Sequence, residues 1–371
     1  MPPEGTSIAE QYRRFASVEA RGASPLYQRL ALGVAGDDEL LGLLAGLPPA
    51  KRQPNLLFAA GRHVNGTPDG YDAFRRDVLG NRDAVVATML SRSTQTNEPA
   101  RCAALYPLLA ALPQPLALLE VGASAGLCLL PDRYGYDYDG HLSGALNSPL
   151  RLHCHVTGAP GRRVGVDPKR PVDGDPERPV NGGPGSYVDS DPGSREGGDP
   201  ESREGGGPRL PGPDAVTVVW RAGIDLNPLD VTDPDDVHWL RTLVWPEQHD
   251  RLHRLDTAIA IARTAPPRIV RGDLNARLAE VAAQAPSHAT LVVFHTAVLW
   301  YLPAEDRATF AWQVERLDGH WISQEAPEVF PGITARLPRR PSPDTALYVL
   351  ALDGRPLAVT AMHGGRQEWL A

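Results

Sequence analysis

The sequence contains few cysteines, few aromatic residues and no long apolar run. Its three cysteines, Cys102, Cys128 and Cys154, form no C-x-x-C pair, which argues against a disulfide framework or a structural metal site and fits a reducing compartment. No stretch of about 18 apolar residues is present, and residues 1–15 lack an apolar signal core, so we expect no membrane association. The 37 basic residues are outnumbered by 45 acidic ones and form no basic block, which argues against nucleic-acid binding. These absences favour a cytoplasmic protein that binds a small molecule, and they leave its oligomeric state open.

Glycine and proline, in contrast, are abundant, and 25 of their 73 occurrences fall within residues 158–214. This segment repeats an octad of the kind Asp-Pro-Lys-Arg-Pro-Val-Asp-Gly, beginning at Asp167. The octads have almost no large apolar side chains, so they cannot offset the entropy of ordering their backbone. We therefore expect residues 158–214 to be a disordered insert in a surface loop.

The N-terminal part of the chain shows helical patterns only. Ser7 and Glu10 form a capping box, and Ser24 followed by Pro25 is a second helix start. Further helices are predicted at residues 38–47, 71–90 and 101–112. Since no strand is predicted before residue 116, we expect residues 1–113 to be a helical N-terminal region.

Strands and helices alternate from residue 116 onward. The expected strands are residues 116–121, 216–220, 268–271, 290–294 and 320–323, followed by a hairpin of residues 346–352 and 355–362 around Asp353-Gly354. Strands separated by helices indicate a mostly parallel sheet with helices on both faces. The predicted fold class is therefore α/β: a Rossmann-like sheet with a C-terminal antiparallel hairpin, occupying residues 114–371.

A glycine loop follows the first predicted strand, with Glu120, Gly122, Ser124 and Gly126 at alternate positions. Small residues at such a loop allow a nucleotide cofactor to approach the backbone at a helix N-terminus. A dinucleotide fingerprint would need a third glycine at position 127, which is leucine. The same residues match the Gly-x-Ser-x-Gly elbow of α/β-hydrolases, in which Ser124 is the nucleophile. An elbow follows several earlier strands, whereas the sequence predicts none here.

Together these elements resemble class I S-adenosylmethionine-dependent methyltransferases over residues 116–362. The resemblance begins at the acidic residue and glycine loop of that family, here Glu120, Gly122, Ser124 and Gly126, with serine in place of the middle glycine. At a finer level the chain resembles an uncharacterised bacterial family that shares its GASAGL, GIDLNP, VRGD and FHTAVL blocks. The resemblance implies that S-adenosylmethionine is the cofactor and that the four loop residues lie at its site.

The resemblance also implies acidic ligands after the second and third strands. Asp225 would bind the ribose hydroxyls, because one carboxylate can accept from both in charge-assisted bonds. Asp137, in Arg-Tyr-Gly-Tyr-Asp-Tyr, is the alternative if that stretch is the second strand. Asp273 would lie near the adenine.

The reaction and its base are less defined by the sequence. His295 ends the fourth predicted strand, at the edge where ligands bind, and is our candidate general base. His363 and Trp245 are further candidates for the pocket. The polar run at residues 91–98 interrupts the helices and is either an exposed loop or a lid, with Asn97, Glu98 or Arg101 reaching the substrate.

The predicted function is methyl transfer from S-adenosylmethionine to a small-molecule acceptor. One alternative is an esterase-type hydrolase that uses Ser124, with Asp273 and His363 in the chain order of such enzymes. Another is a module without catalysis that binds a nucleotide or a partner.

Overall fold

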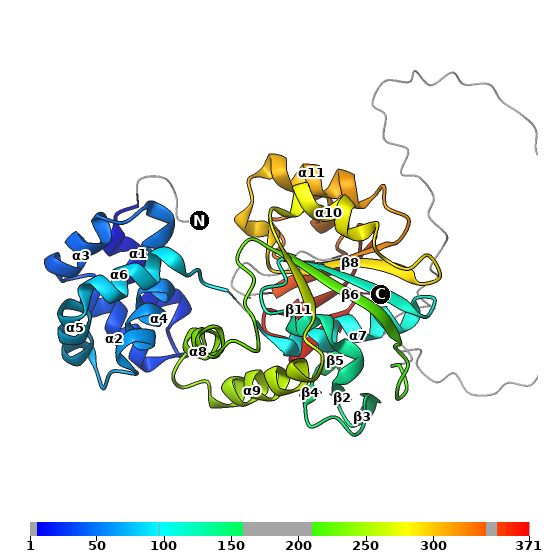
Figure 1. The fold of residues 1–371 in the computed structure, drawn as a ribbon, viewed down its shortest axis with the longest axis horizontal. Coiled ribbons are helices and arrows are strands. Elements are labelled where there is room, and N and C mark those ends of the chain that lie inside the picture. The colour runs from blue at the N-terminus through cyan, green and yellow to red at the C-terminus, as the bar shows by residue number, and fades with distance from the viewer. Residues whose placement is uncertain (1–5, 96, 159–209, 339–346, 371) are drawn as a thin grey trace, which may run out of the picture.

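A nine-stranded sheet lies to one side of the N-terminal helices (Figure 1). Its first strand in the chain is β1 (Leu116–Val121). The computed structural model describes residues 6–95, 97–158, 210–338 and 347–370. None of the described residues before Leu116 forms a strand, as the sequence predicts. Most of the predicted octad insert lies outside the described residues.

The five parallel strands of the sheet have the order of a doubly wound fold. Across the sheet the strands are β5 (His155–Thr157), β12 (Arg366–Trp369), β11 (Arg355–Ala361), β10 (Leu347–Leu352), β9 (His320–Glu325), β8 (Thr290–Thr296), β1, β6 (Val218–Asp225) and β7 (Arg268–Arg271). Strands β7, β6, β1, β8 and β9 are parallel, and β10 and β11 form the predicted antiparallel hairpin. The connections from β1 run to one side and those from β8 to the other, so the topological switch point lies between these two strands.

Helices cover both faces of the sheet. Helices α10 (Leu274–Ala282) and α11 (Ala304–Val314) pack on one face, and α7 (Cys102–Ala111) and α9 (His249–Thr264) on the other (Figure 1). Alternate residues of β1 belong to the two cores, with Leu119 and Val121 on the α10 side and Leu118 on the α9 side. This alternation follows from the period of two in a strand.

The N-terminal helices form a group beside the sheet. They are α1 (Ile8–Arg14), α2 (Pro25–Val34), α3 (Asp38–Ala45), α4 (Pro54–Asn65), α5 (Tyr71–Gly80) and α6 (Arg82–Ser91). The capping box of Ser7 and Glu10 and the Ser24 cap are both present. The long helix predicted at residues 71–90 is two helices that meet at Asn81, and α4 has no counterpart in the prediction.

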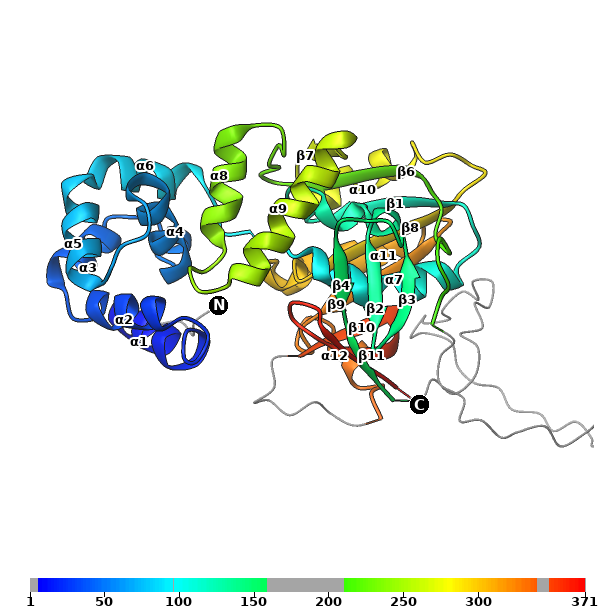
Figure 2. The same cartoon turned by 90° about the horizontal axis from the view of Figure 1, so that it is seen from below.

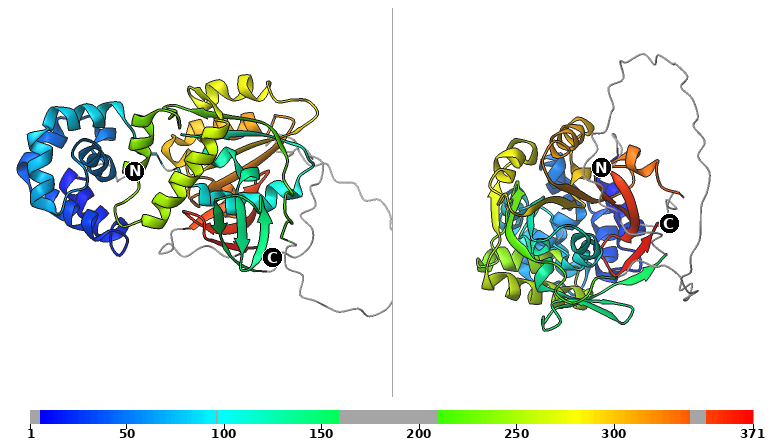
Figure 3. Two further views of the ribbon diagram at one scale, coloured as in Figure 1. Left: turned by 60° about the horizontal axis from the view of Figure 1, so that its bottom comes forward. Right: turned by 90° about the vertical axis from the view of Figure 1, so that its right-hand side faces the viewer.

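Helix α8 (Pro234–Leu243) joins the helical group to the sheet, between which it lies in Figure 2 and in the left panel of Figure 3. It packs against α4, and the ring of the following Trp245 contacts Phe15 edge-on and Tyr27 at a tilt, at ring-centroid distances of 5.7 and 5.6 Å. Residues from both halves of the chain therefore share one core.

A second, three-stranded sheet was not predicted. It has the order β3 (His141–Gly144), β2 (Gly135–Tyr138), β4 (Arg151–His153). The end of the predicted insert packs against it, since the hydroxyl of Ser143 donates to Pro211 O and Asp214 N donates to Gly144 O at 3.2 Å. In the proline-rich stretch before β10 the structure describes one short helix, α12 (Pro331–Thr334). Among the described helices none is long and apolar enough to cross a membrane.

Candidate functional site

A cavity of about 550 Å³ lies at the carboxyl ends of four parallel strands, β1, β6, β7 and β8. Its sheet side is lined by Gly122, Ser124, Ile224, Asp225, Leu226, Asn227, Gly272, Asp273, Leu274, Thr296, Ala297, Val298, Tyr301, Leu302, Pro303 and Asp306. Its other side is lined by Ala50, Lys51, Gln53, Leu56, Ser93, Thr94 and Gln95 from the helical group and the segment after α6. The cavity is therefore at the switch point, where open α/β sheets bind their ligands.

The glycine loop is held to β6 by its own backbone. Gly122 and Ala123 N–H donate to Ile224 O at 2.8 and 3.2 Å, and Gly126 N–H donates to Ala123 O at 2.7 Å. Gly122 has a φ of +71°, and a Cβ there would lie 2.3 Å from a methyl carbon of Val298. The loop continues into one 3-10 turn, Leu127–Leu129, and not into the expected helix. Pro131, which lacks an N–H and limits helices before it, accounts for the difference.

Asp225 lies beside this loop and fixes it. Its Oδ2 accepts from Ser124 N at 2.8 Å, and its Oδ1 accepts from Asn227 N at 2.7 Å and from the Gln95 amide at 3.3 Å. Asp137, the alternative ribose ligand, is in β2 of the small sheet, where its carboxylate accepts from Gly140 N, and it does not line the cavity. The structure thus places Asp225 and not Asp137 with the glycine loop.

The described residues of the polar segment at 91–98 contact this edge of the sheet. The Asn97 amide donates to Ser124 Oγ at 2.6 Å and accepts from Ala125 N at 3.1 Å. Gln95 also donates to Asn227 O at 2.8 Å. The segment therefore contacts both the loop after β1 and the turn after β6.

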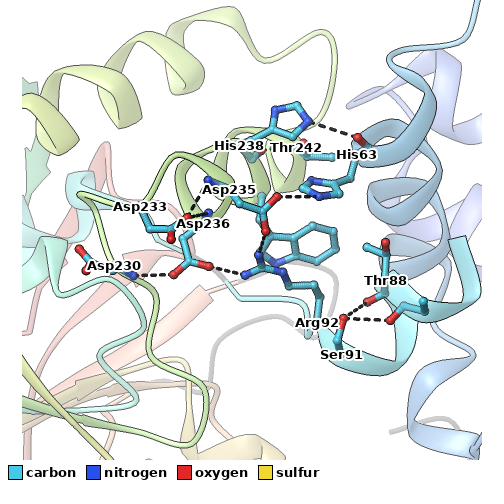
Figure 4. Close-up of polar contacts among 12 residues, drawn as sticks. His63, Thr88, Ser91, Arg92, Asp230, Asp233, Asp235, Asp236, His238 and Thr242 are labelled. Carbon is cyan, nitrogen blue, oxygen red and sulfur yellow. Dashed lines mark hydrogen bonds and ion pairs between the residues drawn. The ribbon is translucent and has the colours of Figure 1, made fainter. Parts of the chain in front are cut away.

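Helix α8 anchors the start of that segment (Figure 4). The guanidinium of Arg92 bonds to the carboxylates of Asp235 and Asp236, and His63 Nε2 lies 3.2 Å from Asp235. The indole N–H of Trp239 donates to Ser93 O at 3.2 Å. These contacts fix the segment between the helical group and α8.

The remaining predicted cofactor residues have different positions. Asp273 lines the cavity, but its Oδ1 also caps α10 by accepting from Ala276 N at 3.0 Å. Gly126 packs behind the loop, where a Cβ would lie 2.6 Å from Pro267 Cγ. Glu120 is buried below the loop, and burial raises its pKa well above the ordinary value. Neither Gly126 nor Glu120 lines the cavity.

His295 is fully buried on the α11 side of the sheet. Its Nδ1 lies 2.8 Å from Glu325 Oε1, and its Nε2 accepts from the indole N–H of Trp321 at 3.0 Å. Both ring nitrogens are thus occupied within the protein, and the ring does not line the cavity. Glu325 Oε1 also accepts from Val298 N and Leu299 N, both at 2.9 Å, so this pair holds the turn after β8.

Neither of the two further pocket candidates lines the cavity. Trp245 lies in the core of the helical group, where its indole N–H donates to Asn55 Oδ1 at 3.1 Å. His363 is exposed after β11.

The charge that lines the cavity is mainly negative. Asp225, Asp273 and Asp306 provide three carboxylates, and Lys51 provides the one ammonium among the described lining residues. Burial lowers the pKa of Lys51, whose Nζ donates to Arg92 O at 2.6 Å. Such a cavity attracts cationic groups and repels phosphates.

Comparison with known proteins gives a family. A family model described as "Uncharacterized protein conserved in bacteria (DUF2332)" matches residues 9–180 and 194–369. The chain belongs to this family. No curated protein and no solved structure matches the chain.

For this member of the family, sequence reasoning missed the cavity residues contributed by the helical side. Leu56 belongs to α4, a helix that was not predicted, and Lys51 and Gln53 lie in the segment just before it. The polar run at residues 91–98 was the one available signal, and Ser93, Thr94 and Gln95 belong to it.

Proposed function

We propose that this protein transfers a methyl group from S-adenosylmethionine to a small-molecule acceptor. One observation carries the proposal: Asp225 is hydrogen-bonded to the glycine loop, and both line a single cavity beside the switch point. This is where doubly wound sheets bind nucleotide-type ligands. The volume of about 550 Å³ is within the usual range of small-molecule sites.

Asp225 fits the role of ribose ligand. A carboxylate offers about four acceptor positions, and Asp225 uses three of them within the protein. The contact with Gln95, at 3.3 Å the longest of the three, is the one that a ribose hydroxyl can replace. The bonds to Ser124 N and Asn227 N would then keep the carboxylate in place while it accepts from the ligand.

The charge of the cavity favours this ligand over a dinucleotide. S-adenosylmethionine, when bound, supplies a methyl group activated on a positively charged sulfur. Three carboxylates against one ammonium would stabilise a sulfonium and destabilise a pyrophosphate.

Methyl transfer is an in-line displacement, so the protein mainly supplies proximity and a dry pocket. The segment with Ser93 and Gln95 covers the cavity on one side, and Tyr301 and Leu302 flank it on the other. His295, whose nitrogens are both occupied, supports the turn that carries Thr296 and Val298 and is not placed to accept a proton from an acceptor in the cavity.

Calorimetry with S-adenosylhomocysteine tests the proposal. We expect micromolar binding to the full chain and none of comparable strength for NAD, which carries a pyrophosphate. Absence of S-adenosylhomocysteine binding at millimolar concentration would refute it. Binding without turnover on any acceptor would favour a module without catalysis.

A hydrolase is the second candidate, because Ser124 has the left-handed backbone, with a φ of +51°, that an elbow nucleophile requires. Its hydroxyl, however, accepts a hydrogen bond from Asn97, and no imidazole contacts it among the described residues. A fluorophosphonate probe that labels the protein, with labelling lost in Ser124→Ala, would establish the hydrolase and overturn methyl transfer.

A further inference from the structure

Three arginines form a cluster beside the cavity, on the side of β8. Arg101 is 3% exposed, and its Nη1 lies 3.1 Å from Thr296 O and 3.3 Å from Thr296 Oγ1. Its Nε donates to Met362 O at 3.0 Å. Because Thr296 also lines the cavity, Arg101 lies directly behind the cavity wall.

The other two members of this arginine cluster, Arg251 and Arg254, lie one turn apart on α9 and share one carboxylate. Glu98, fully buried, has its Oε2 2.9 Å from Arg251 Nε and its Oε1 3.3 Å from Arg254 Nε. The arginine side chains keep 15% and 29% of their surface exposed. Glu98 therefore holds both guanidinium groups in place and leaves part of each accessible.

The nearby acidic groups do not balance the cluster. Burial raises the pKa of Glu120, which favours its neutral form. Glu325 is bound to His295 and to two backbone amides of the turn after β8. Among the described residues Glu98 is the carboxylate that pairs with the cluster, so three guanidinium groups leave a positive excess.

The positive field reaches the protein surface next to the cavity. His363 follows Met362 and keeps access to solvent. Desolvation by the surrounding protein, together with the charges of Arg251, Arg101 and Arg254, lowers its pKa to about 3. Tyr301 lines the cavity and is also within the field of Arg101. Arg101 lies 5.9 Å from the ring centre of Tyr348. The partly exposed side chains of Arg251 and Arg254 and the exposed ring of Tyr301 thus give a positively charged region with access to solvent.

We propose that the arginine cluster binds an anionic group, a carboxylate or a phosphate, of the acceptor molecule. Guanidinium groups bind both anions through paired N–H donors, and partial burial strengthens such bonds. An acceptor held there would extend past Thr296 and Tyr301 into the cavity. This assignment of substrate class rests on the proposed methyl transfer, whereas the anion site itself can be tested alone.

The imidazole resonance of His363, assigned by its loss in His363→Gln, reports on the site. Benzoate and inorganic phosphate are titrated at constant ionic strength, with benzamide as the neutral counterpart of benzoate. A bound anion stabilises the imidazolium, so we expect at least one anion to shift the resonance and raise the pKa of His363, while benzamide does neither. A stronger effect of benzoate identifies a carboxylate, and a stronger effect of phosphate a phosphate ester.

Variants distinguish anion binding by the arginine cluster from a general effect of the protein's charge. Arg254→Gln, in which Arg251 still pairs with Glu98, should weaken anion binding at least tenfold. Arg254→Lys keeps the positive charge but loses the paired N–H donors of the guanidinium group, so it should weaken anion binding less. Arg241→Gln removes an equal charge from the exposed pair with Asp256 and should leave binding unchanged.

Two results would overturn the inference: no response of His363 to either anion at tens of millimolar, or an equal response in the wild type and Arg254→Gln. Calorimetry with S-adenosylhomocysteine on the same samples keeps the two proposals apart. If the cofactor binds and the anions do not, only the proposal of an anionic acceptor is refuted. Anion binding without cofactor binding supports the anion site and refutes methyl transfer.

Discussion

Replacing Asp225 by asparagine is the sharpest test of the cofactor site, because it keeps the shape of the side chain and removes its charge. In the structure Oδ2 accepts from Ser124 N at 2.8 Å and Oδ1 from Asn227 N at 2.7 Å. Asparagine retains one acceptor oxygen, so one of these two amides loses its partner. We expect the free energy of unfolding to fall by about 1–2 kcal/mol, which urea denaturation can measure.

The effect of Asp225→Asn on ligand affinity follows from the same loss of one acceptor oxygen. A hydrogen bond to a charged acceptor contributes about 1.5–3 kcal/mol, and a neutral one about 0.5–1.5 kcal/mol. Weakening one ribose bond and losing the other should cost about 2.5–4.5 kcal/mol, or about 70- to 2,000-fold in affinity. Calorimetry with S-adenosylhomocysteine, under conditions in which Asp225→Asn is folded, gives this ratio.

Asp137→Asn is the matched control. It makes the same chemical change in β2, away from the cavity lining, and should leave the affinity for S-adenosylhomocysteine within about twofold. A folded Asp225→Asn protein that binds as tightly as the wild type would show that our assignment of Asp225 is wrong. A loss confined to Asp137→Asn would move the ribose site to β2.

Three further predictions concern the glycine loop, the contacts of Arg92 with α8 and the dependence of stability on pH. Gly122→Ala places a Cβ at a φ of +71° and against Val298, so urea denaturation should show a loss of about 1–3 kcal/mol, and an unchanged midpoint would contradict the packing. Arg92→Gln leaves Asp235 and Asp236 without their guanidinium partner. It should lower the free energy of unfolding by about 1–2 kcal/mol and weaken S-adenosylhomocysteine binding. If neither quantity changes, the contacts of Arg92 with α8 do not support the site. Desolvation by the surrounding protein and the nearby arginines lower the pKa of His363 to about 3 from an ordinary 6.5, so the unfolded chain binds the proton more readily. Stability should therefore fall as the pH drops below about 6.5, and fall less in His363→Gln, when urea midpoints at about pH 7 and about pH 5 are compared.

Several features of the fold follow from local sequence alone. The apolar run ending in Gly122 predicts β1, Asp353-Gly354 predicts the C-terminal hairpin, and Ser7 with Glu10 predicts the first helix; all three are confirmed. Each depends on residues close together in the chain, whose conformational preferences act before any tertiary contact forms. The family resemblance likewise depends on short blocks, and the matching family model confirms the uncharacterised bacterial family.

Other features were decided only by tertiary structure. His295 ends β8 as predicted, but the alternation along that strand directs its side chain to Glu325 and Trp321, while its neighbour Thr296 lines the cavity. A shift of one residue in strand register reverses this choice, and the sequence of one strand does not fix its register.

The pairing of distant segments is the other property that the sequence left open. Asp225 and Asp137 are both acids near the end of a strand, and only the position of β6 beside β1 distinguishes them. The covering of the cavity by Gln95 and Lys51 depends on α8 bringing the helical group to the sheet. Local sequence therefore determined the elements and the loop, whereas long-range packing determined which side chains share the site, because those contacts join residues more than a hundred positions apart.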